Sequence, residues 1–318
     1  MDVKCESLGK KVKSALSNRN FVFVLAIILG LVVGQGANFI KPLLLPLIAV
    51  AMTLTTISIT NHDLKFMIRS PRTLLISLLL NYVIMSGVIL LMAQWVRNDS
   101  ELWAGLVTIA AMPIATNAVP FTYMLGGDTA FALMSVAGLH LVAIALAPAM
   151  MILFLGVDLV NPVKLLLTLL YLIVIPVAVS RLLLFKGLGQ VMTKWQDTVV
   201  TWCYFTTIYI IIGSNSELFF EQPDILLKVI LIAVTVTFIM GQVVYFITRK
   251  SHSDQSKSIT FAIIGTRKNT GLASAIALSF LGQRASFPTA VFAIVQISYL
   301  VWQGFYLKKQ AAKDSSLL

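Results

Sequence analysis

The two residues best placed to do chemistry are Arg267 and Lys268, which interrupt an apolar segment at 257–281 about ten residues from either end. A charge at the centre of a bilayer costs about 2.5–3.5 kcal/mol on insertion scales, so such residues usually face a water-filled cavity or a polar partner. A guanidinium group can clamp an anion through its planar fork, and an ammonium group offers three hydrogen-bond donors. The structural alternative is that both side chains snorkel or cap the carbonyl groups of a broken helix.

A second apolar segment, 103–125, shares an unusual pattern with the first. In each segment Thr-x-Ala is followed by an asparagine nine residues after the threonine, at Asn117 and at Asn269. Helix-breaking residues interrupt both segments at Pro113, Pro120, Gly265 and Gly271. Backbone that leaves the helix at membrane depth is tolerated only where protein or a water-filled cavity satisfies it.

These interruptions place neutral hydroxyl and amide groups inside the membrane. The residues concerned are Thr116, Asn117, Asn269 and Thr270. The N-termini of half-helices direct partial positive charge at an anion, whereas freed carbonyl groups can hold a cation. We therefore expect a binding site for a charged solute at the two interruptions. The alternative is that proline and glycine are simply frequent in membrane helices.

The elements that must position these residues are membrane helices. Of the 318 residues, 58% are hydrophobic and 12% are charged, with a mean hydropathy of +0.91, whereas a typical soluble domain has roughly 45–50% apolar and about 25% charged residues. This composition excludes a soluble enzyme and a nucleic-acid-binding protein. Apolar runs of about 20 residues predict an all-α polytopic membrane protein with ten transmembrane spans at 20–37, 41–60, 73–95, 103–125, 129–156, 162–185, 198–220, 225–248, 257–281 and 286–307.

The two interrupted segments are the fourth and ninth spans, so they occupy equivalent places in two halves of five spans. The halves cover residues 20–156 and 162–307 of a single transmembrane domain, 1–318. An odd number of spans forces the halves to insert in opposite orientations. Interrupted helices at matching positions of an inverted repeat indicate the binding site of a transporter.

The basic residues set the orientation in the membrane. Of the 24 Lys and Arg residues, seventeen fall on one side of the predicted spans and five on the other. Because cytoplasmic loops collect Lys and Arg, both termini are predicted to be cytoplasmic, in the plasma (inner) membrane. The net charge of +11 therefore mostly reflects topology, and we expect the lipid bilayer rather than nucleic acid as the macroscopic partner.

At these residues the sequence resembles the bile acid:sodium symporter superfamily. The segment 265–273 is similar to the family's span 9 signature, 80–85 resembles its span 3 motif, and Thr116-Asn117 with 122–128 resembles its span 4 motif. The resemblance implies ten spans in a 5+5 inverted repeat with crossed, broken helices 4 and 9. It also implies that panel-like helices 1, 2, 6 and 7 move against a core of helices 3–5 and 8–10.

The departures from the family pattern concern its sodium site. Ile264 stands where sodium-binding members carry a glutamate, Lys268 replaces a glutamine, and Asn81 replaces the longer glutamine of span 3. We expect the Lys268 ammonium to occupy the sodium position and to hydrogen-bond unwound carbonyl groups and Asn81 or Asn117. Transport would then be sodium-independent, as uniport, exchange or proton-coupled movement with Lys268 as proton carrier. The alternative is a sodium-coupled symporter with a rebuilt ion site.

The favoured function is secondary active transport of a small organic anion, most simply a carboxylate, with Arg267 as a candidate anion clamp. An anion channel is a further alternative. The spans contain no catalytic constellation, and Cys5 and Cys203 lack metal-ligand spacing, so we expect neither an enzyme nor a metal or other cofactor. His140 in the fifth span is either a proton relay or, more simply, a histidine bonded to a neighbouring helix. The sequence leaves the substrate, the direction of transport and the oligomeric state open.

Overall fold

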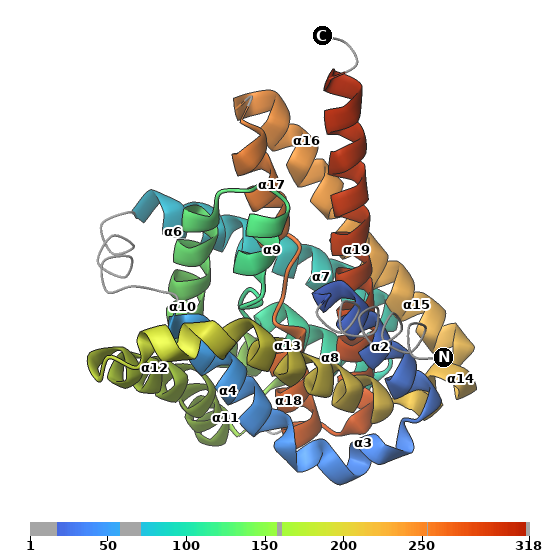
Figure 1. The fold of residues 1–318 in the computed structure, drawn as a ribbon. Coiled ribbons are helices and arrows are strands. Elements are labelled where there is room, and N and C mark those ends of the chain that lie inside the picture. Colours follow the sequence, from blue (N-terminus) through green and yellow to red (C-terminus); the bar gives the residue numbers. More distant parts are fainter. Residues whose placement is uncertain (1–17, 58–70, 158–160, 253, 316–318) are drawn as a thin grey trace, which may run out of the picture.

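The computed structural model describes residues 18–57, 71–157, 161–252 and 254–315, and these residues form helices and connecting turns without a strand (Figure 1). Six helices within these ranges are long and apolar enough to cross a membrane: Gln35–Ile57, Pro71–Val96, Thr129–Leu155, Pro162–Phe185, Pro223–Ser251 and Gln283–Gln310. The chain is therefore an all-helical integral membrane protein. Many large apolar side chains are exposed on its outer surface, as a lipid-facing surface requires.

Within the described residues, the first half of the chain folds into a series of helices. They are α2 (Arg19–Val32), α3 (Gln35–Ile40), η1 (Lys41–Leu43), α4 (Leu44–Ile57), α6 (Pro71–Leu78), η2 (Leu79–Met85), α7 (Ser86–Ala93), η3 (Gln94–Val96), α8 (Ser100–Ala111), α9 (Ala118–Met124) and α10 (Thr129–Leu155).

The helices of the second half continue in the same way. They are α11 (Pro162–Leu169), η4 (Leu170–Val174), α12 (Ile175–Phe185), α13 (Gly189–Gly213), α14 (Ser216–Glu221), α15 (Pro223–Val234), η5 (Thr235–Ile239), α16 (Met240–His252), α17 (Gln255–Ile264), α18 (Thr270–Phe280) and α19 (Gln283–Ser315). The stretches η2, η4 and η5 are π-helical, a form that frequently occurs at functional sites because it perturbs the regular hydrogen-bond ladder.

Two non-helical stretches lie inside the protein. Helix α8 ends at Ala111 and α9 begins at Ala118, while α17 ends at Ile264 and α18 begins at Thr270. Pro113 has no N–H, so it cannot donate the next hydrogen bond of the first of these helices. The carbonyl group of that proline instead accepts the backbone N–H of Asn269 at 2.8 Å. The two non-helical stretches are therefore hydrogen-bonded to each other.

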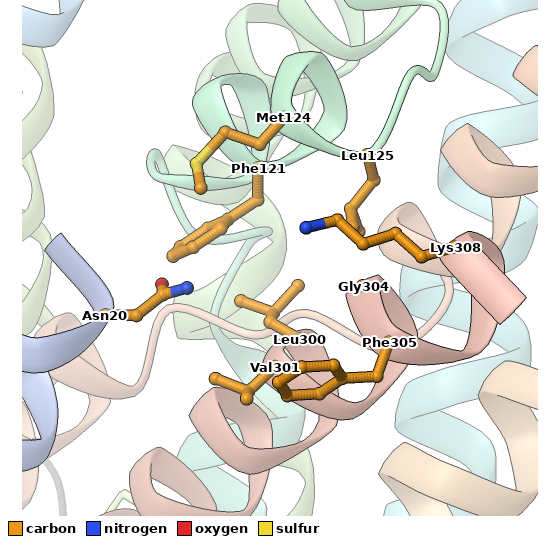
Figure 2. A pocket seen from close by; sticks show the side chains of 9 residues that line it. All are labelled: Asn20, Phe121, Met124, Leu125, Leu300, Val301, Gly304, Phe305 and Lys308. Atoms are coloured by element: carbon orange, nitrogen blue, oxygen red, sulfur yellow. The ribbon is translucent and has the colours of Figure 1, made fainter. Parts of the chain in front are cut away.

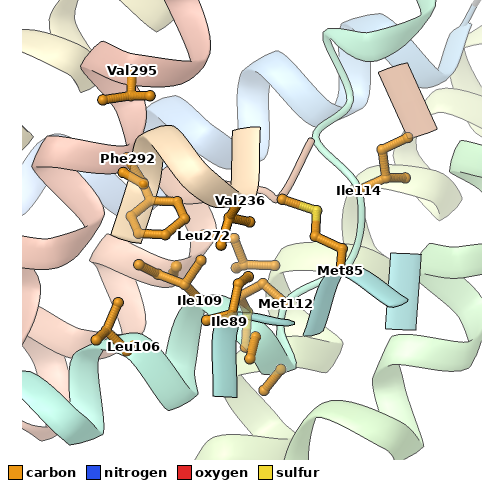
Figure 3. Packing of buried hydrophobic residues seen from close by; sticks show 14 of the residues in the cluster. Met85, Ile89, Leu106, Ile109, Met112, Ile114, Val236, Leu272, Phe292 and Val295 are labelled. Atoms are coloured by element: carbon orange, nitrogen blue, oxygen red, sulfur yellow. The ribbon is translucent and has the colours of Figure 1, made fainter. Parts of the chain in front are cut away.

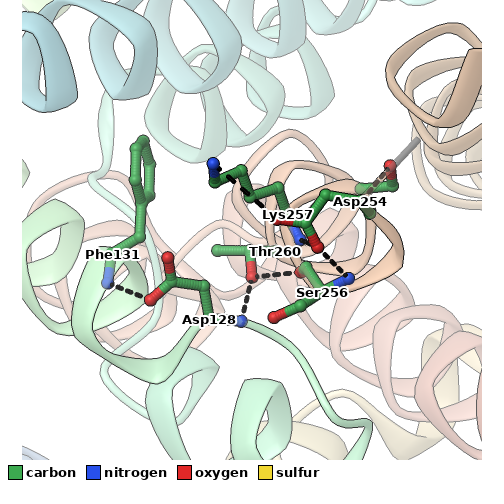
Figure 4. Close-up of polar contacts among 7 residues, drawn as sticks. Asp128, Phe131, Asp254, Ser256, Lys257 and Thr260 are labelled. Atoms are coloured by element: carbon green, nitrogen blue, oxygen red, sulfur yellow. Dashed lines mark hydrogen bonds and ion pairs between the residues drawn. The ribbon is translucent and has the colours of Figure 1, made fainter. Parts of the chain in front are cut away.

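A second junction joins these helices at one end (Figure 4). The backbone N–H of Asp128, which caps α10, donates to the hydroxyl of Thr260 in α17 at 2.7 Å, and that hydroxyl donates to the carbonyl of Ser256 at 2.8 Å. Asp254 caps α17 and pairs with Lys257 at 3.7 Å. The exposed ion pair contributes little, so the partly buried hydrogen bonds hold the α9–α10 turn on α17.

Apolar packing surrounds the non-helical stretches. Side chains from η2, α8, α18 and α19 and from the first non-helical stretch meet there, namely Met85, Ile109, Leu272, Phe292 and Met112 (Figure 3). Helices α8 and α19 also approach closely, since a Cβ atom at position 105 would lie 2.1 Å from a carbonyl oxygen at the start of α19. Dense packing of this kind excludes water, which raises the cost of any unpaired polar group.

Some boundaries differ from the predicted spans. The first span was expected to reach residue 37, but α2 ends at Val32, because the chain turns at Gly34 where it packs against Gly213. The seventh span was expected from 198, whereas α13 begins at Gly189. Residues 58–60 of the predicted second span and several basic residues used for orientation, namely Lys4, Lys10, Lys11, Lys13, Lys65 and Arg69, lie outside the described residues.

Candidate functional site

Lys268 lies in the non-helical stretch before α18, and its side chain is fully buried. The Nζ atom donates to Asn81 Oδ1 at 3.1 Å, to the carbonyl of Ala110 at 2.9 Å and to the carbonyl of Met112 at 2.8 Å. It also lies 4.3 Å from the centre of the Tyr82 ring, whose π face attracts a cation. All three donors of the ammonium group are thus satisfied, two of them by carbonyl groups at the end of α8.

Asn81 completes this arrangement from the π-helical stretch η2. Its Nδ2 group donates to the carbonyls of Ile264 and Arg267, both at 2.9 Å, while its Oδ1 atom accepts from Lys268. The side chain is fully buried, so water does not compete for these bonds. One asparagine therefore satisfies the freed carbonyl groups of one interruption, and the lysine satisfies those of the other.

Arg267 occupies a neighbouring environment with a different character. One terminal nitrogen donates to Asn117 Oδ1 at 2.6 Å, and the other donates to the backbone carbonyl of Gln296 at 3.2 Å. The guanidinium group lies over the ring of Phe121, 5.4 Å from its centre. Its Nε atom is buried and has no hydrogen-bond partner within the described part of the chain. The Nε–H donor of Arg267 is therefore unused.

Within the described residues, neither of these cations has a carboxylate partner. The ion pairs within the described ranges involve Arg19, Lys257 and Arg284 instead. A buried charge without a counter-charge is costly, and it is tolerated where hydrogen bonds or a bound ion compensate it. Hydrogen bonds satisfy all the donors of Lys268, whereas those of Arg267 are satisfied only in part.

The other predicted site residues lie close by. Thr116, beside Asn117, shares a hydrogen bond between hydroxyl groups with Tyr204 of α13. The side chain of Asn269 caps α18 by accepting the N–H of Leu272 at 3.0 Å. Thr270 is the first residue of that helix and is half-buried. The structure thus gathers Asn81, Thr116, Asn117, Arg267, Lys268, Asn269 and Thr270 around the two interruptions.

The hydrogen bond of His140 lies within its own helix, α10. Its Nδ1 atom is 2.7 Å from the carbonyl of Val136, one turn earlier in α10, and its Nε2 atom is buried without a partner in the described residues. No hydrogen bond joins it to the seven residues above within those ranges. Its role as a proton relay stays a prediction.

Three residues of the site were missed by the sequence reading. In the amide orientation that pairs both groups, the Gln296 side-chain nitrogen donates to the Lys268 carbonyl and its oxygen accepts the Lys268 backbone N–H, each at 3.2 Å. Tyr82 supplies the aromatic face and Tyr204 the hydroxyl contact. The glutamine was detectable as a polar residue in an apolar span, whereas the two tyrosines are ordinary in sequence.

A pocket of about 180 Å³ opens beside this cluster, between α2, α9 and α19 (Figure 2). Its lining is mostly apolar, with Phe121 on one wall and polar groups from Asn20 and Lys308 at opposite sides. Phe121 lines the pocket and also carries the guanidinium group of Arg267 over its ring. As for metals, the described residues contain no group of three or more His, Cys, Asp or Glu side chains able to hold an ion.

Apolar membrane helices that meet at buried, hydrogen-bonded cations are the architecture of a transporter. The profile of the Sodium Bile acid symporter family matches residues 43–222. The chain belongs to this family, whose members are transporters and not enzymes. Its similarity extends to a protein of Bacillus subtilis (strain 168) named "Uncharacterized sodium-dependent transporter YocS", which is 21% identical over 270 residues covering 82% of this chain and 83% of that protein.

Proposed function

We propose that this transporter carries a small organic anion, most simply a carboxylate, by alternating access and without sodium. The observation that carries the proposal is the triple coordination of the Lys268 ammonium by Asn81 Oδ1 and the carbonyls of Ala110 and Met112. Oxygen atoms of this kind are ligands for a hard cation such as sodium. The lysine supplies that positive charge from within the chain.

Electrostatics supports sodium independence. Two unit charges about 4 Å apart repel by about 4 kcal/mol at an effective dielectric constant of about 20, so a sodium ion next to this ammonium is strongly disfavoured. Ile264 at the position of the family's glutamate offers no compensating carboxylate. The tethered ammonium would therefore perform the structural role of the ion, leaving uniport, exchange or proton coupling.

The second buried cation, Arg267, supports an anionic substrate. Arg267 has an unused Nε donor, no carboxylate partner among the described residues, and the Asn117 amide beside it. Helices α9 and α18 begin next to these groups, and the N-terminus of a helix favours negative charge. A carboxylate would match the planar fork of the guanidinium group. Thr116, Asn269 and Thr270 are the further candidate contacts.

We further propose the ten-span arrangement in which α8–α9 and α17–α18 are the crossed, broken fourth and ninth helices. Their matching interruptions support it, as do π-helical stretches in the third and eighth predicted spans, at η2 and η5. Helices α2, α4, α12 and α13 contact one another and would form the panel-like unit. The seventeen-to-five distribution of basic residues supports cytoplasmic termini in the plasma (inner) membrane.

A sodium-coupled symporter with a rebuilt ion site is the second candidate, and the printed name of the Bacillus subtilis relative favours it. The two candidates differ in a transport assay. Purified wild type and Lys268→Gln are reconstituted into proteoliposomes, and uptake of radiolabelled pantoate, 2-oxoisovalerate, taurocholate and sulfate is measured with and without sodium and proton gradients. Wild-type uptake without sodium, lost in Lys268→Gln, supports the tethered cation. Strong, saturable sodium stimulation of the wild type contradicts it.

A further inference from the structure

One hydrogen bond at the site joins helices that belong to different parts of the proposed architecture. The hydroxyl of Tyr204, on α13, is bonded to the hydroxyl of Thr116, just before α9. In the proposed arrangement α13 belongs to the panel-like unit and α9 to the core. Thr116 adjoins Asn117, which accepts from Arg267. The panel therefore reaches directly into the group of residues expected to bind the anion.

Aromatic packing extends this contact. The ring of Phe23, on α2, meets Tyr204 edge-on at a centroid distance of 6.3 Å and Phe121 at 6.5 Å. Phe121 in turn carries the guanidinium of Arg267 on its face and lines the pocket. Phe121 therefore contacts both the pocket and Arg267, and Phe23 connects it to Tyr204.

We propose that the Tyr204 hydroxyl occupies part of the anion site in the empty carrier, and that a bound carboxylate displaces it from Thr116. The carboxylate offers stronger, charge-assisted hydrogen bonds to the Thr116 hydroxyl and to the unused Nε donor of Arg267 than a phenol does. Displacement removes a bond between α13 and α9, so substrate binding and the release of the panel from the core become one event. The inference rests on the proposed function of the Arg267 site.

This coupling has a kinetic consequence. The empty carrier must break the Tyr204–Thr116 bond before the panel moves, whereas the loaded carrier has already exchanged it for bonds to substrate. Loaded carriers therefore reorient faster than empty ones, and exchange of substrate for substrate is faster than net efflux. One neutral hydrogen bond corresponds to a rate difference of about two- to tenfold. The protein would behave preferentially as an exchanger.

The test compares Tyr204→Phe with Tyr209→Phe. Tyr209 lies on the same helix and donates its hydroxyl to the carbonyl of Val33, within the panel-like unit. Efflux of the best-transported radiolabelled anion among pantoate, 2-oxoisovalerate, taurocholate and sulfate is measured from proteoliposomes, with and without the same unlabelled anion outside. We expect Tyr204→Phe to lower the ratio of exchange to net efflux about two- to tenfold, and Tyr209→Phe to keep the wild-type ratio.

An unchanged ratio in Tyr204→Phe, or an equal fall in both variants, overturns the inference while leaving the proposed function intact. Size-exclusion chromatography of purified Tyr204→Phe, compared with wild type and Tyr209→Phe, guards against a folding defect in this variant. Absence of substrate-dependent flux in folded wild type overturns the proposed function itself. The two failures are therefore distinguishable.

Discussion

Replacing Asn81 with leucine tests whether this side chain connects the two non-helical stretches. The substitution keeps the branching and the number of side-chain heavy atoms but removes the acceptor of the Lys268 ammonium and the donors to two buried carbonyls. A hydrogen bond to a charged group is worth about 1.5–3 kcal/mol and a neutral one about 0.5–1.5 kcal/mol, so the expected loss is about 2.5–6 kcal/mol. No water can replace these bonds, because the side chain is fully buried.

The measurement is thermal unfolding of the detergent-solubilised protein. Aliquots are heated to different temperatures, and size-exclusion chromatography then measures the fraction that stays folded. A loss of this size lowers Tm by roughly 4–9 °C for a chain of this length. The matched control is Ser77→Ala, one turn earlier on the same buried face, where only neutral bonds to Ser135 and to the carbonyl of Thr73 are involved. The reasoning is refuted when Asn81→Leu lowers Tm no more than this control does.

Three further outcomes follow from the structure. Arg267→Lys keeps the charge but loses the planar fork, so KM for the carboxylate rises about tenfold in an uptake assay while folding is retained; an unchanged KM removes Arg267 from the anion site. Gly105→Ala pushes α8 away from α19 and sharply lowers the yield of folded protein, whereas Gly87→Ala, which has open space, does not; equal yields contradict the packing. Burial would raise the pKa of Asp99, but hydrogen bonds and the charge of Arg284 outweigh it and set that pKa below its usual value. Arg284→Gln therefore lowers Tm at neutral pH. The difference in Tm from wild type vanishes as the pH falls through the pKa of Asp99 in the folded protein, and a difference that persists in acid contradicts this.

The helix interruptions could be anticipated from the sequence because their causes are local. Pro113 lacks the N–H that would extend the helical hydrogen-bond ladder, and Gly265 has a low helix propensity. Arg267 and Lys268 could likewise be identified as candidate site residues, because a charge within an apolar segment is unusual whatever the surrounding fold. The membrane location and the family could also be predicted, because composition and motifs are properties of the sequence itself. Both predictions were confirmed.

The contacts themselves could be anticipated only in part. Lys268 was expected to bond Asn81 or Asn117, and the structure pairs it with Asn81, while Arg267 takes Asn117. The choice depends on how helices far apart in sequence cross, which periodicity does not specify. The carbonyl ligands of the ammonium were equally hidden, because they are backbone groups that become available only where a helix ends.

Residues that act through tertiary position left the weakest signals. Tyr204 stands in an ordinary apolar helix, and nothing in its local sequence indicates a partner beside Asn117. Gln296 was visible as a polar residue in a span, but its pairing with the backbone of Lys268 required the fold. Side chains of this kind are found only after the crossing of the interrupted helices has been determined.

The most direct test of the central proposal measures the sodium flux itself. Proteoliposomes containing the wild-type protein are supplied with radioactive sodium outside, and its entry is recorded while a transported carboxylate moves inward at a fixed membrane potential. With Lys268 serving as the fixed cation, carboxylate uptake proceeds and sodium entry stays at the level of protein-free liposomes. Sodium entry in constant proportion to carboxylate uptake would show that the ion site has been rebuilt and that Lys268 does not replace sodium.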